Sequence, residues 1–319
     1  MKAIIYRQYG SPEVLQLKEL EKPIPKQNEV LIRVSATAVN SGDVRLRKAD
    51  PFAIRLFMGL MKPRISILGC VFSGKIEQVG SAVTLFKVGD QVFGHTDMSF
   101  GTYAEYKCFP ENGSLALKPA TITHTEAAVI SFGGTTALHF IKKANIKKGQ
   151  KVLVNGASGA VGTAAVQLAK HFGAIVTGVC STANIELVKS LGADQVVDYT
   201  KEDFTKNGET YDVIFDTVNA IEIRDSIQSC TINGKLILSA AGISEMLQGF
   251  WASMASNRKV KVLTGVISHT AEDINFLKEL IESGQLKPVI DRTYSLDQTA
   301  AAHSYVEKGH KKGNVAITV

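Results

Sequence analysis

The chain has 319 residues, of which 45% are hydrophobic and 21% charged, and its formal net charge is +6. This size and composition suit two ordinary domains, each with its own hydrophobic core. No uninterrupted apolar run reaches the roughly eighteen residues of a membrane span. The densest basic run, 142–151, is expected to coat a helix end. We therefore expect neither a membrane nor a nucleic acid as a partner.

Cysteine usage points to a reducing compartment. The four cysteines are scattered, and none is spaced as in a C-x-x-C pair or a metal-ligand set. The N-terminus enters a strand-like segment at once, without the long apolar core of a signal peptide. A cytoplasmic location is the expectation.

Strand-like segments dominate the first 120 residues. They lie at 30–39, 74–80, 91–96 and 102–109, and Gly, Pro and Asp residues separate them. Several short strands with such turns predict a compact all-β or barrel-like domain. Helical patterning begins at 123–141, where Thr123 and Glu126 have the spacing of a capping box.

The most informative segment is KVLVNGASGAVGT, at 151–163. A β-branched run at 152–154 leads into a glycine-rich turn, and a helix is predicted at 163–172. Gly156 permits a tight turn, Gly159 lets the backbone approach phosphates, and Gly162 lets the helix pack closely on the strand. The N–H groups at the helix N-terminus favour an anion. The sequence predicts a dinucleotide site, and an ordinary glycine-rich turn is the alternative.

Further strands and helices alternate after this turn. Strands are predicted at 175–179, 195–199 and 211–218, with a helix at 184–192. This alternation predicts a doubly wound parallel sheet with right-handed crossovers. After residue 268 the chain shows helix, strand, helix and strand patterns at 271–284, 289–296, 297–309 and 314–319. We expect this tail to return to the first domain.

The end of the second predicted strand favours NADPH as cofactor. An acidic residue there would bind the ribose 2′-hydroxyl of NADH. This chain has Cys180, Ser181 and Thr182 instead, which bring two hydroxyls and no carboxylate to repel a 2′-phosphate. A positive partner must come from elsewhere, and the C-terminal lysines at 308, 311 and 312 are candidates, with Lys311 preferred.

Open parallel sheets bind ligands at the carboxyl ends of their strands. The cofactor contacts expected on this ground are Gly156, Ser158, Gly159, Ala160, Val161, Gly162, Ser181, Thr182, Thr217, Val218, Ala241, Gly242, Val266 and Ile267.

The whole chain resembles the zinc-independent quinone oxidoreductases of the medium-chain dehydrogenase/reductase superfamily. The resemblance rests on MKAIIYRQYGSPEVLQL, VNSGDVRLR, SGKIEQVGSAVTLFKVGDQVFG, GTYAEY, SFGGTTAL and GASGAVG. It implies a GroES-like β-rich domain at 1–123, completed by 269–319, and a Rossmann domain at 124–268 that binds NADPH. It also implies a cleft between the domains and a homodimer that pairs edge strands at 260–267.

The resemblance also indicates that no metal is bound. Zinc-containing relatives hold their catalytic metal with two cysteines and a histidine, and the matching positions here are Asn40, Cys70 and Ser131. Tetrahedral zinc needs three N, S or O⁻ protein ligands, which an amide, a thiol and a hydroxyl do not provide. Without a metal to stabilise charge on one oxygen, conjugated acceptors are favoured, because they spread the incoming charge.

Residues matched to the family complete the predicted site. Asn40 and Asp43 correspond to an Asn-x-x-Asp segment near the nicotinamide, and Asp43 could orient Arg45 or Arg47; an Asx-stabilised turn is the alternative. Arg45 stands where relatives often have tyrosine. Thr135 matches a threonine beside the nicotinamide, unless it is a buried helix hydroxyl. Tyr199 matches a tyrosine of the family that is expected near the 2′-phosphate. The alternative is that Tyr199 is an ordinary aromatic residue at the end of a strand.

The function expected from all of this is NADPH-dependent reduction of quinones or related enones. Hydride passes to the acceptor and solvent supplies the proton, since no general acid can be named. The seven histidines show no spacing that suggests a proton relay. Two alternatives remain open: a 2-alkenal or enoyl-thioester reductase, and an NADPH-binding sensor or structural protein with little turnover.

Overall fold

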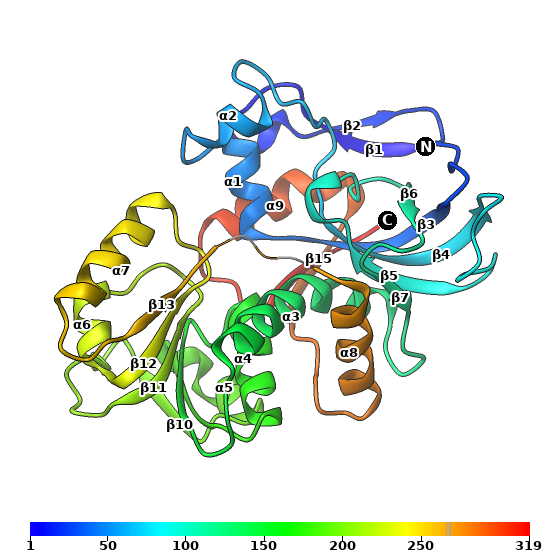
Figure 1. The fold of residues 1–319 in the computed structure, drawn as a ribbon. Helices are drawn as coiled ribbons and strands as arrows, with labels where there is room; N and C mark the ends of the chain where they lie inside the picture. Colours follow the sequence, from blue (N-terminus) through cyan, green and yellow to red (C-terminus); the bar gives the residue numbers. More distant parts are fainter. Residues whose placement is uncertain (266, 268) are drawn as a thin grey trace. The chain divides into compact units, whose positions relative to one another are not determined.

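The computed structural model describes residues 1–265, 267 and 269–319. The chain forms two compact units (Figure 1). Unit 1 comprises Met1–Phe132, His269–Ser283 and Pro288–Val319. Unit 2 comprises Gly133–Ser268, apart from the two undescribed positions, and Gly284–Lys287. The C-terminal segment thus packs with the N-terminal one.

Unit 1 is built on a seven-stranded sheet of order β14-β15-β3-β4-β5-β7, with β6 paired to β3 and a separate β1–β2 pair. Its elements are β1 (Lys2–Ile5), β2 (Gln16–Glu19), β3 (Glu29–Val39), α1 (Ser41–Lys48), α2 (Ile54–Met58), β4 (Val71–Val79), β5 (Gln91–His95), β6 (Tyr106–Pro110), β7 (Leu115–Leu117), α8 (Ala271–Glu282), β14 (Ile290–Ser295), α9 (Thr299–Glu307) and β15 (Asn314–Thr318). The helix α3 (His124–Ala144) begins in unit 1 and ends in unit 2.

The expected all-β character of the first domain is wrong for 41–58, which forms α1 and α2. Helix α1 begins after Asn40, whose backbone N–H is accepted by Asp43 Oδ2 at 2.9 Å. It ends at Lys48, and the C-cap residue Ala49 adopts φ +54°. The predicted capping box of α3 is confirmed, because Thr123 N–H donates to Glu126 Oε2 and Glu126 N–H donates to Thr123 Oγ1.

Unit 2 contains a six-stranded parallel sheet of order β10-β9-β8-β11-β12-β13. Numbered from its first strand this order is 3-2-1-4-5-6, the Rossmann arrangement. Its elements are β8 (Lys151–Asn155), α4 (Ala160–His171), β9 (Ile175–Cys180), α5 (Ile185–Ser190), β10 (Gln195–Asp198), β11 (Tyr211–Asp216), α6 (Ile223–Gln228), β12 (Cys230–Leu238), α7 (Ile243–Ala255) and β13 (Lys261–Leu263). The predicted fold class is confirmed.

Two boundaries in unit 2 differ from expectation. Helix α4 begins at Ala160, three residues before the predicted 163, with Gly159 as its N-cap. Of the strand expected at 260–267, the structure forms Lys261–Leu263, and Val266 lies outside the described residues. Gly265 has φ +120°, which extended strands do not use. Within the described residues, no helix has both the length and the apolar character needed to cross a bilayer.

Candidate coenzyme and substrate sites

The glycine-rich turn connects β8 to α4 in unit 2. Gly156 has φ +76°, a left-handed conformation that glycine adopts without strain. Gly159 is the N-cap of α4 and has no side chain that could cap the helix. The first N–H groups of α4 therefore have no acceptor within the helix and are available to an anion.

The surroundings of the glycines test whether a dinucleotide fits. A Cβ on Gly156 would lie 2.5 Å from Val218 Cγ1, and one on Gly162 would lie 2.0 Å from Gly156 O, so internal packing requires both glycines. A Cβ on Gly159 would meet only Gly156 O, at 3.4 Å, which is ordinary contact. Gly159 is thus not required by the protein's own packing. Its missing side chain leaves room for a phosphate, and the residues fit NADPH.

The strand order reverses between β8 and β11, where Rossmann sheets bind their ligands. Asn155 and Asp216 face each other across the final register position of these strands. Thr217 Oγ1 donates to Asn155 O at 2.8 Å, so the residue after β11 is tied to the end of β8. Val218 is half-exposed beside the turn. Thr217 and Val218 therefore lie next to the glycine-rich turn, as the sequence predicts.

A carboxylate lies beside the end of β9, where the sequence predicts the 2′-phosphate. Thr182 Oγ1 donates to Asp198 Oδ2 at 2.5 Å, and Thr200 Oγ1 donates to Asp198 Oδ1 at 2.7 Å. These hydroxyls hold the pKa of Asp198 down, at about 2. Thr182 has only one hydroxyl proton, and Asp198 already accepts it. Thr182 can therefore donate to a phosphate, as the sequence predicts, only by giving up its hydrogen bond to Asp198.

Asn184 links the glycine-rich turn to the end of β9. Its Nδ2 donates to Ser158 Oγ at 3.1 Å and to Ser181 Oγ at 3.2 Å. Its buried Oδ1 has no hydrogen-bond partner among the described residues. A buried polar atom without a partner is costly, so this atom marks a place where a bound ligand or water would be stabilising. Ser158 and Ser181, both predicted contacts, are thus brought together.

The remaining predicted cofactor contacts are more dispersed. Thr135 is buried within α3, and Tyr199 is 60% exposed just after β10. Gly242 is the N-cap of α7, next to Ala241. Ile267 is partly buried, and Val266 lies outside the described residues. Lys311 is in unit 1, where its Nζ donates to Gly313 O at 2.6 Å, and burial lowers its pKa to about 8. A role for these residues toward NADPH stays a prediction.

In unit 1, Asn40 and Asp43 form a buried polar group at the start of α1. Asp43 accepts the N–H of Asn40 through Oδ2 and the N–H of Gly69, at 3.2 Å, through Oδ1. Burial raises the pKa of Asp43 to about 6. Both carboxylate oxygens serve the backbone, so the geometry favours the turn-stabilising alternative for Asp43. Asn40 Nδ2 donates to Cys70 Sγ at 3.6 Å.

The arginines of α1 lie in different environments. Arg45 is exposed. Arg47 is fully buried and its Nη2 donates to Glu307 Oε2 of α9 at 2.7 Å. This ion pair joins α1 to the C-terminal helix, and the expected orientation of Arg47 by Asp43 is replaced by this contact. A catalytic role for Arg45 stays a prediction.

The positions that hold zinc in relatives do not fit a metal here. Burial raises the pKa of the Cys70 thiol well above its usual value, whereas zinc binds the thiolate. Asn40 offers a neutral amide, whose Nδ2 donates to that thiol, and Ser131 Oγ donates to Ala127 O at 3.1 Å. A neutral thiol, an amide and an occupied hydroxyl are a poor set of zinc ligands.

Sequence reasoning missed two features of these sites. Asp198 was overlooked because it follows a different strand from Thr182, and only parallel pairing of β9 with β10 brings them together. The histidine spacing predicts no pairing, yet the rings of His95 and His269 stack with centroids 3.8 Å apart in unit 1. No spacing along the chain signals either contact.

Comparison with known proteins supports the same interpretation. Residues 26–120 match the alcohol dehydrogenase GroES-like domain family, and residues 191–317 match the zinc-binding dehydrogenase family. The chain is 34% identical to the 2-methylene-furan-3-one reductase of Solanum lycopersicum, over 99% of this chain and 79% of the relative. It is 32% identical, over the same shares, to the chloroplastic NADPH-dependent alkenal/one oxidoreductase of Arabidopsis thaliana. The structure of the quinone oxidoreductase from Coxiella burnetii superposes with a TM-score of 0.91 at 29% identity, covering 100% of this chain and 99% of that one.

Proposed function

The chain belongs to the medium-chain dehydrogenase/reductase superfamily and is an NADPH-dependent oxidoreductase of its quinone oxidoreductase-like group, and we propose that it reduces quinones and related conjugated carbonyls without zinc. The observation that carries this proposal is the set of side chains Asn40, Cys70 and Ser131, which suits no Lewis acid. An acceptor that spreads charge through conjugation has the least need of one.

The residues of this chain bind and orient the reactants. The open N-terminus of α4 and the space at Gly159 suit the pyrophosphate of NADPH. Ser158, Ser181 and Asn184 form a connected polar group that suits its adenosine end. Bound NADPH supplies a hydride, and a proton from solvent completes the two-electron reduction of the acceptor. In unit 1 the buried amide of Asn40 is a candidate donor to an acceptor carbonyl.

A steady-state assay tests this function. NADPH oxidation is followed by absorbance with 1,4-benzoquinone, 2-hexenal and crotonyl-CoA in turn, before and after treatment with EDTA. We expect turnover with the quinone or the alkenal that EDTA does not reduce. Preference for crotonyl-CoA would instead indicate an enoyl-thioester reductase. Tight NADPH binding without turnover on any acceptor would indicate a sensor or structural protein, and activity lost with zinc would overturn metal independence.

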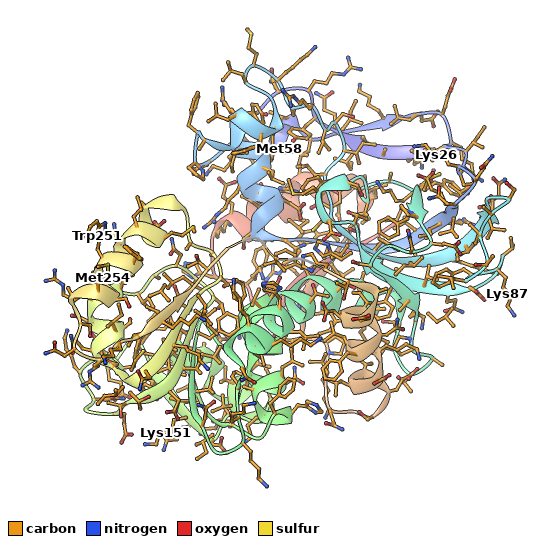
Figure 2. The ribbon with its side chains drawn as sticks, viewed as in Figure 1. Lys26, Met58, Lys87, Lys151, Trp251 and Met254 are labelled. Carbon is orange, nitrogen blue, oxygen red and sulfur yellow. The ribbon has the colours of Figure 1, made fainter. Side chains whose placement is uncertain are left out.

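The proposal includes a homodimer formed through β13. This strand is last in the sheet of the described residues, so one of its edges lacks a strand partner. Five large side chains of α7 are exposed and spaced as on one side of a helix: Met246, Leu247, Phe250, Trp251 and Met254. Figure 2 labels Trp251 and Met254 among them. A hollow of about 610 Å³ lies between α7 and residues 259–264. An apolar stripe beside an open strand edge suits a second copy of this chain.

A cytoplasmic location is also part of the proposal. All four cysteines are free thiols, and three of them are buried. Free thiols persist in a reducing compartment. Fluorescence of a tagged chain in cell fractions tests this location, and recovery in an organelle fraction would contradict it.

A further inference from the structure

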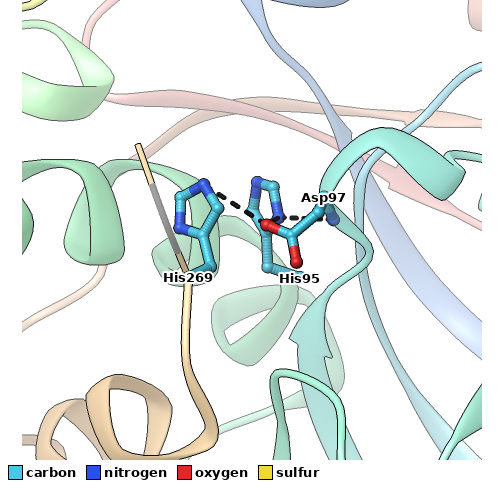
Figure 3. A group of neighbouring side chains, drawn as sticks. All are labelled: His95, Asp97 and His269. Carbon is cyan, nitrogen blue, oxygen red and sulfur yellow. Dashed lines mark hydrogen bonds and ion pairs between the residues drawn. The ribbon is translucent and has the colours of Figure 1, made fainter. Parts of the chain in front are cut away.

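Three side chains with metal-binding chemistry converge in unit 1 (Figure 3). His95 ends β5, Asp97 begins the short 3₁₀ turn that follows it, and His269 precedes α8. Asp97 Oδ1 lies 3.5 Å from His95 Nδ1 and 3.8 Å from His269 Nε2. One candidate ligand atom from each residue lies within 4.8 Å of the others.

We propose that His95, Asp97 and His269 bind a divalent transition-metal ion of the zinc class. Two imidazole nitrogens and one carboxylate oxygen are typical ligands of such ions, whereas Mg²⁺ and Ca²⁺ prefer oxygen ligands alone. With zinc bonds of about 2.0–2.2 Å, tetrahedral ligand atoms lie about 3.4 Å apart. Both separations from Asp97 are close to this value. The proposal does not depend on the identity of the acceptor or the coenzyme.

The protonation of His95 suits this role. Asp97 N–H donates to His95 Nδ1 at 2.9 Å, so in the neutral ring this nitrogen carries a lone pair and no proton. An ion at Nδ1 replaces one hydrogen bond and releases no proton from the ring. The histidine side chains are 5% and 7% exposed, but that of Asp97 is 47% exposed, so an ion can enter from solvent past the carboxylate.

Two features limit the expected affinity. The stacked rings must turn, because an imidazole lone pair lies in the ring plane and rings only 25° from parallel do not direct their lone pairs towards one point. His95 Nε2 has no hydrogen-bond partner in the described part of the chain, whereas metal-binding histidines usually donate from their second nitrogen. Loss of such a partner weakens metal binding by about 10- to 100-fold. We therefore expect a reversible site rather than a permanent structural one.

This site is separate from the position that holds zinc in relatives. His95 pairs with Val71 across β4 and β5, and Thr96 N–H donates to Cys70 O at 2.7 Å. His95 thus lies close to Cys70, but the proposed site does not use the Cys70 thiol. The proposed site supplies two imidazoles, whereas the position matched to the zinc ligands of relatives supplies none.

The experiment uses the full chain stripped of metal with EDTA and dialysed. Calorimetric titration with ZnCl₂ is expected to show one ion per chain, and CoCl₂ is expected to give the visible absorption of a Co²⁺ ion held by nitrogen and oxygen. MgCl₂ should give neither signal. Asp97→Asn, whose altered side chain is half-exposed, and His269→Gln should each weaken Zn²⁺ binding by at least about tenfold.

His171→Gln is the matched control, because His171 is a histidine of α4, in unit 2. It should bind Zn²⁺ like the parent chain. Thermal unfolding without metal checks that each variant is folded. Absence of Zn²⁺ and Co²⁺ binding in the parent chain would overturn the proposal, as would equal binding in the parent chain and in folded Asp97→Asn and His269→Gln. Turnover of the metal-free enzyme is measured separately and reports on the proposed function alone.

Discussion

Asn155 Nδ2 donates to Asp216 Oδ1 at 2.9 Å and thereby joins the carboxyl ends of two parallel strands, β8 and β11. Both side chains are buried, and burial raises the pKa of the Asp216 carboxyl. Asp216 Oδ1 also accepts the N–H of Val218 at 3.2 Å. The pair thus fixes the loop after β11 against the glycine-rich turn, at the point where the strand order of the sheet reverses.

Asn155→Ala should lower both stability and coenzyme affinity. Removing the amide leaves a buried carboxylate with one partner fewer, which costs about 1–3 kcal/mol of unfolding free energy. Urea unfolding and NADPH titration measure the two effects. Asn275→Ala, on the exposed side of α8, is the control. Equal stability of the two variants would show that the Asn155–Asp216 contact does not hold this region.

Alanine at two glycines of the turn should separate binding from folding. Gly162→Ala places a Cβ 2.0 Å from Gly156 O and should destabilise the fold by about 1–3 kcal/mol. Gly159→Ala meets its nearest atom at 3.4 Å and should leave stability nearly unchanged while weakening NADPH binding. Thermal unfolding and fluorescence titration distinguish them. Tight NADPH binding by Gly159→Ala would contradict the placement of the pyrophosphate.

Asp198→Asn should increase the preference for NADPH over NADH. The carboxylate stays ionised, since the hydroxyls of Thr182 and Thr200 lower its pKa to about 2. A negative charge near a 2′-phosphate weakens its binding, whereas NADH carries no such phosphate. The asparagine oxygen can accept from one threonine, and its NH2 group can donate to the hydroxyl oxygen of the other. We expect NADPH to bind about threefold more tightly at low salt, with NADH unchanged. An equal change for both coenzymes would place the phosphate elsewhere.

Acid should destabilise the protein through His303, which is buried beside Tyr103, Arg47 and Glu307. Burial lowers the pKa of His303 from 6.5 to about 3. Between pH 6.5 and about 3, His303 is protonated in the unfolded chain but neutral in the folded chain. The free energy of unfolding therefore falls as the pH falls below 6.5. The expected slope is up to about 1.4 kcal/mol per pH unit.

The difference in unfolding free energy between the parent chain and His303→Gln isolates this effect. Asp43 acts in the opposite direction, because its raised pKa of about 6 lets the folded state hold a proton that the unfolded state has lost. Its contribution is common to both chains and cancels. Stability curves that run parallel between pH 6.5 and 4 would mean that His303 is not buried as a neutral ring.

Trp251→Glu should dissociate the proposed dimer. Trp251 is 65% exposed on α7, and a carboxylate buried between two copies would be strongly unfavourable. Light scattering should show a dimer for the parent chain and a monomer for the variant, with unfolding free energy per chain little altered. Leu117→Glu, an exposed apolar position in unit 1, is the control. A parent chain that is monomeric at micromolar concentration would contradict the dimer.

Much of the fold can be predicted from the sequence, because the signals that indicate it are local. The glycines at 156, 159 and 162, the β-branched run before them and the alternation after them follow from backbone sterics and periodicity alone. Helices α1 and α2 were missed, since 41–58 is short and its start depends on contacts of Asn40 and Asp43 with each other and with Gly69. The edge strand β13 was overextended for a similar reason, because β-propensity does not register the φ of Gly265.

The sequence by itself determined that this chain binds a dinucleotide in a Rossmann unit and lacks the usual zinc ligands, because the turn and the missing ligands are read from residue types at fixed spacing. Only the tertiary structure decided which distant side chains meet: Asn155 with Asp216, Thr182 with Asp198, Arg47 with Glu307, and His95 with Asp97 and His269. The physical reason is that strand pairing and side-chain packing bring these residues together, and their separation along the sequence does not indicate which of them will meet.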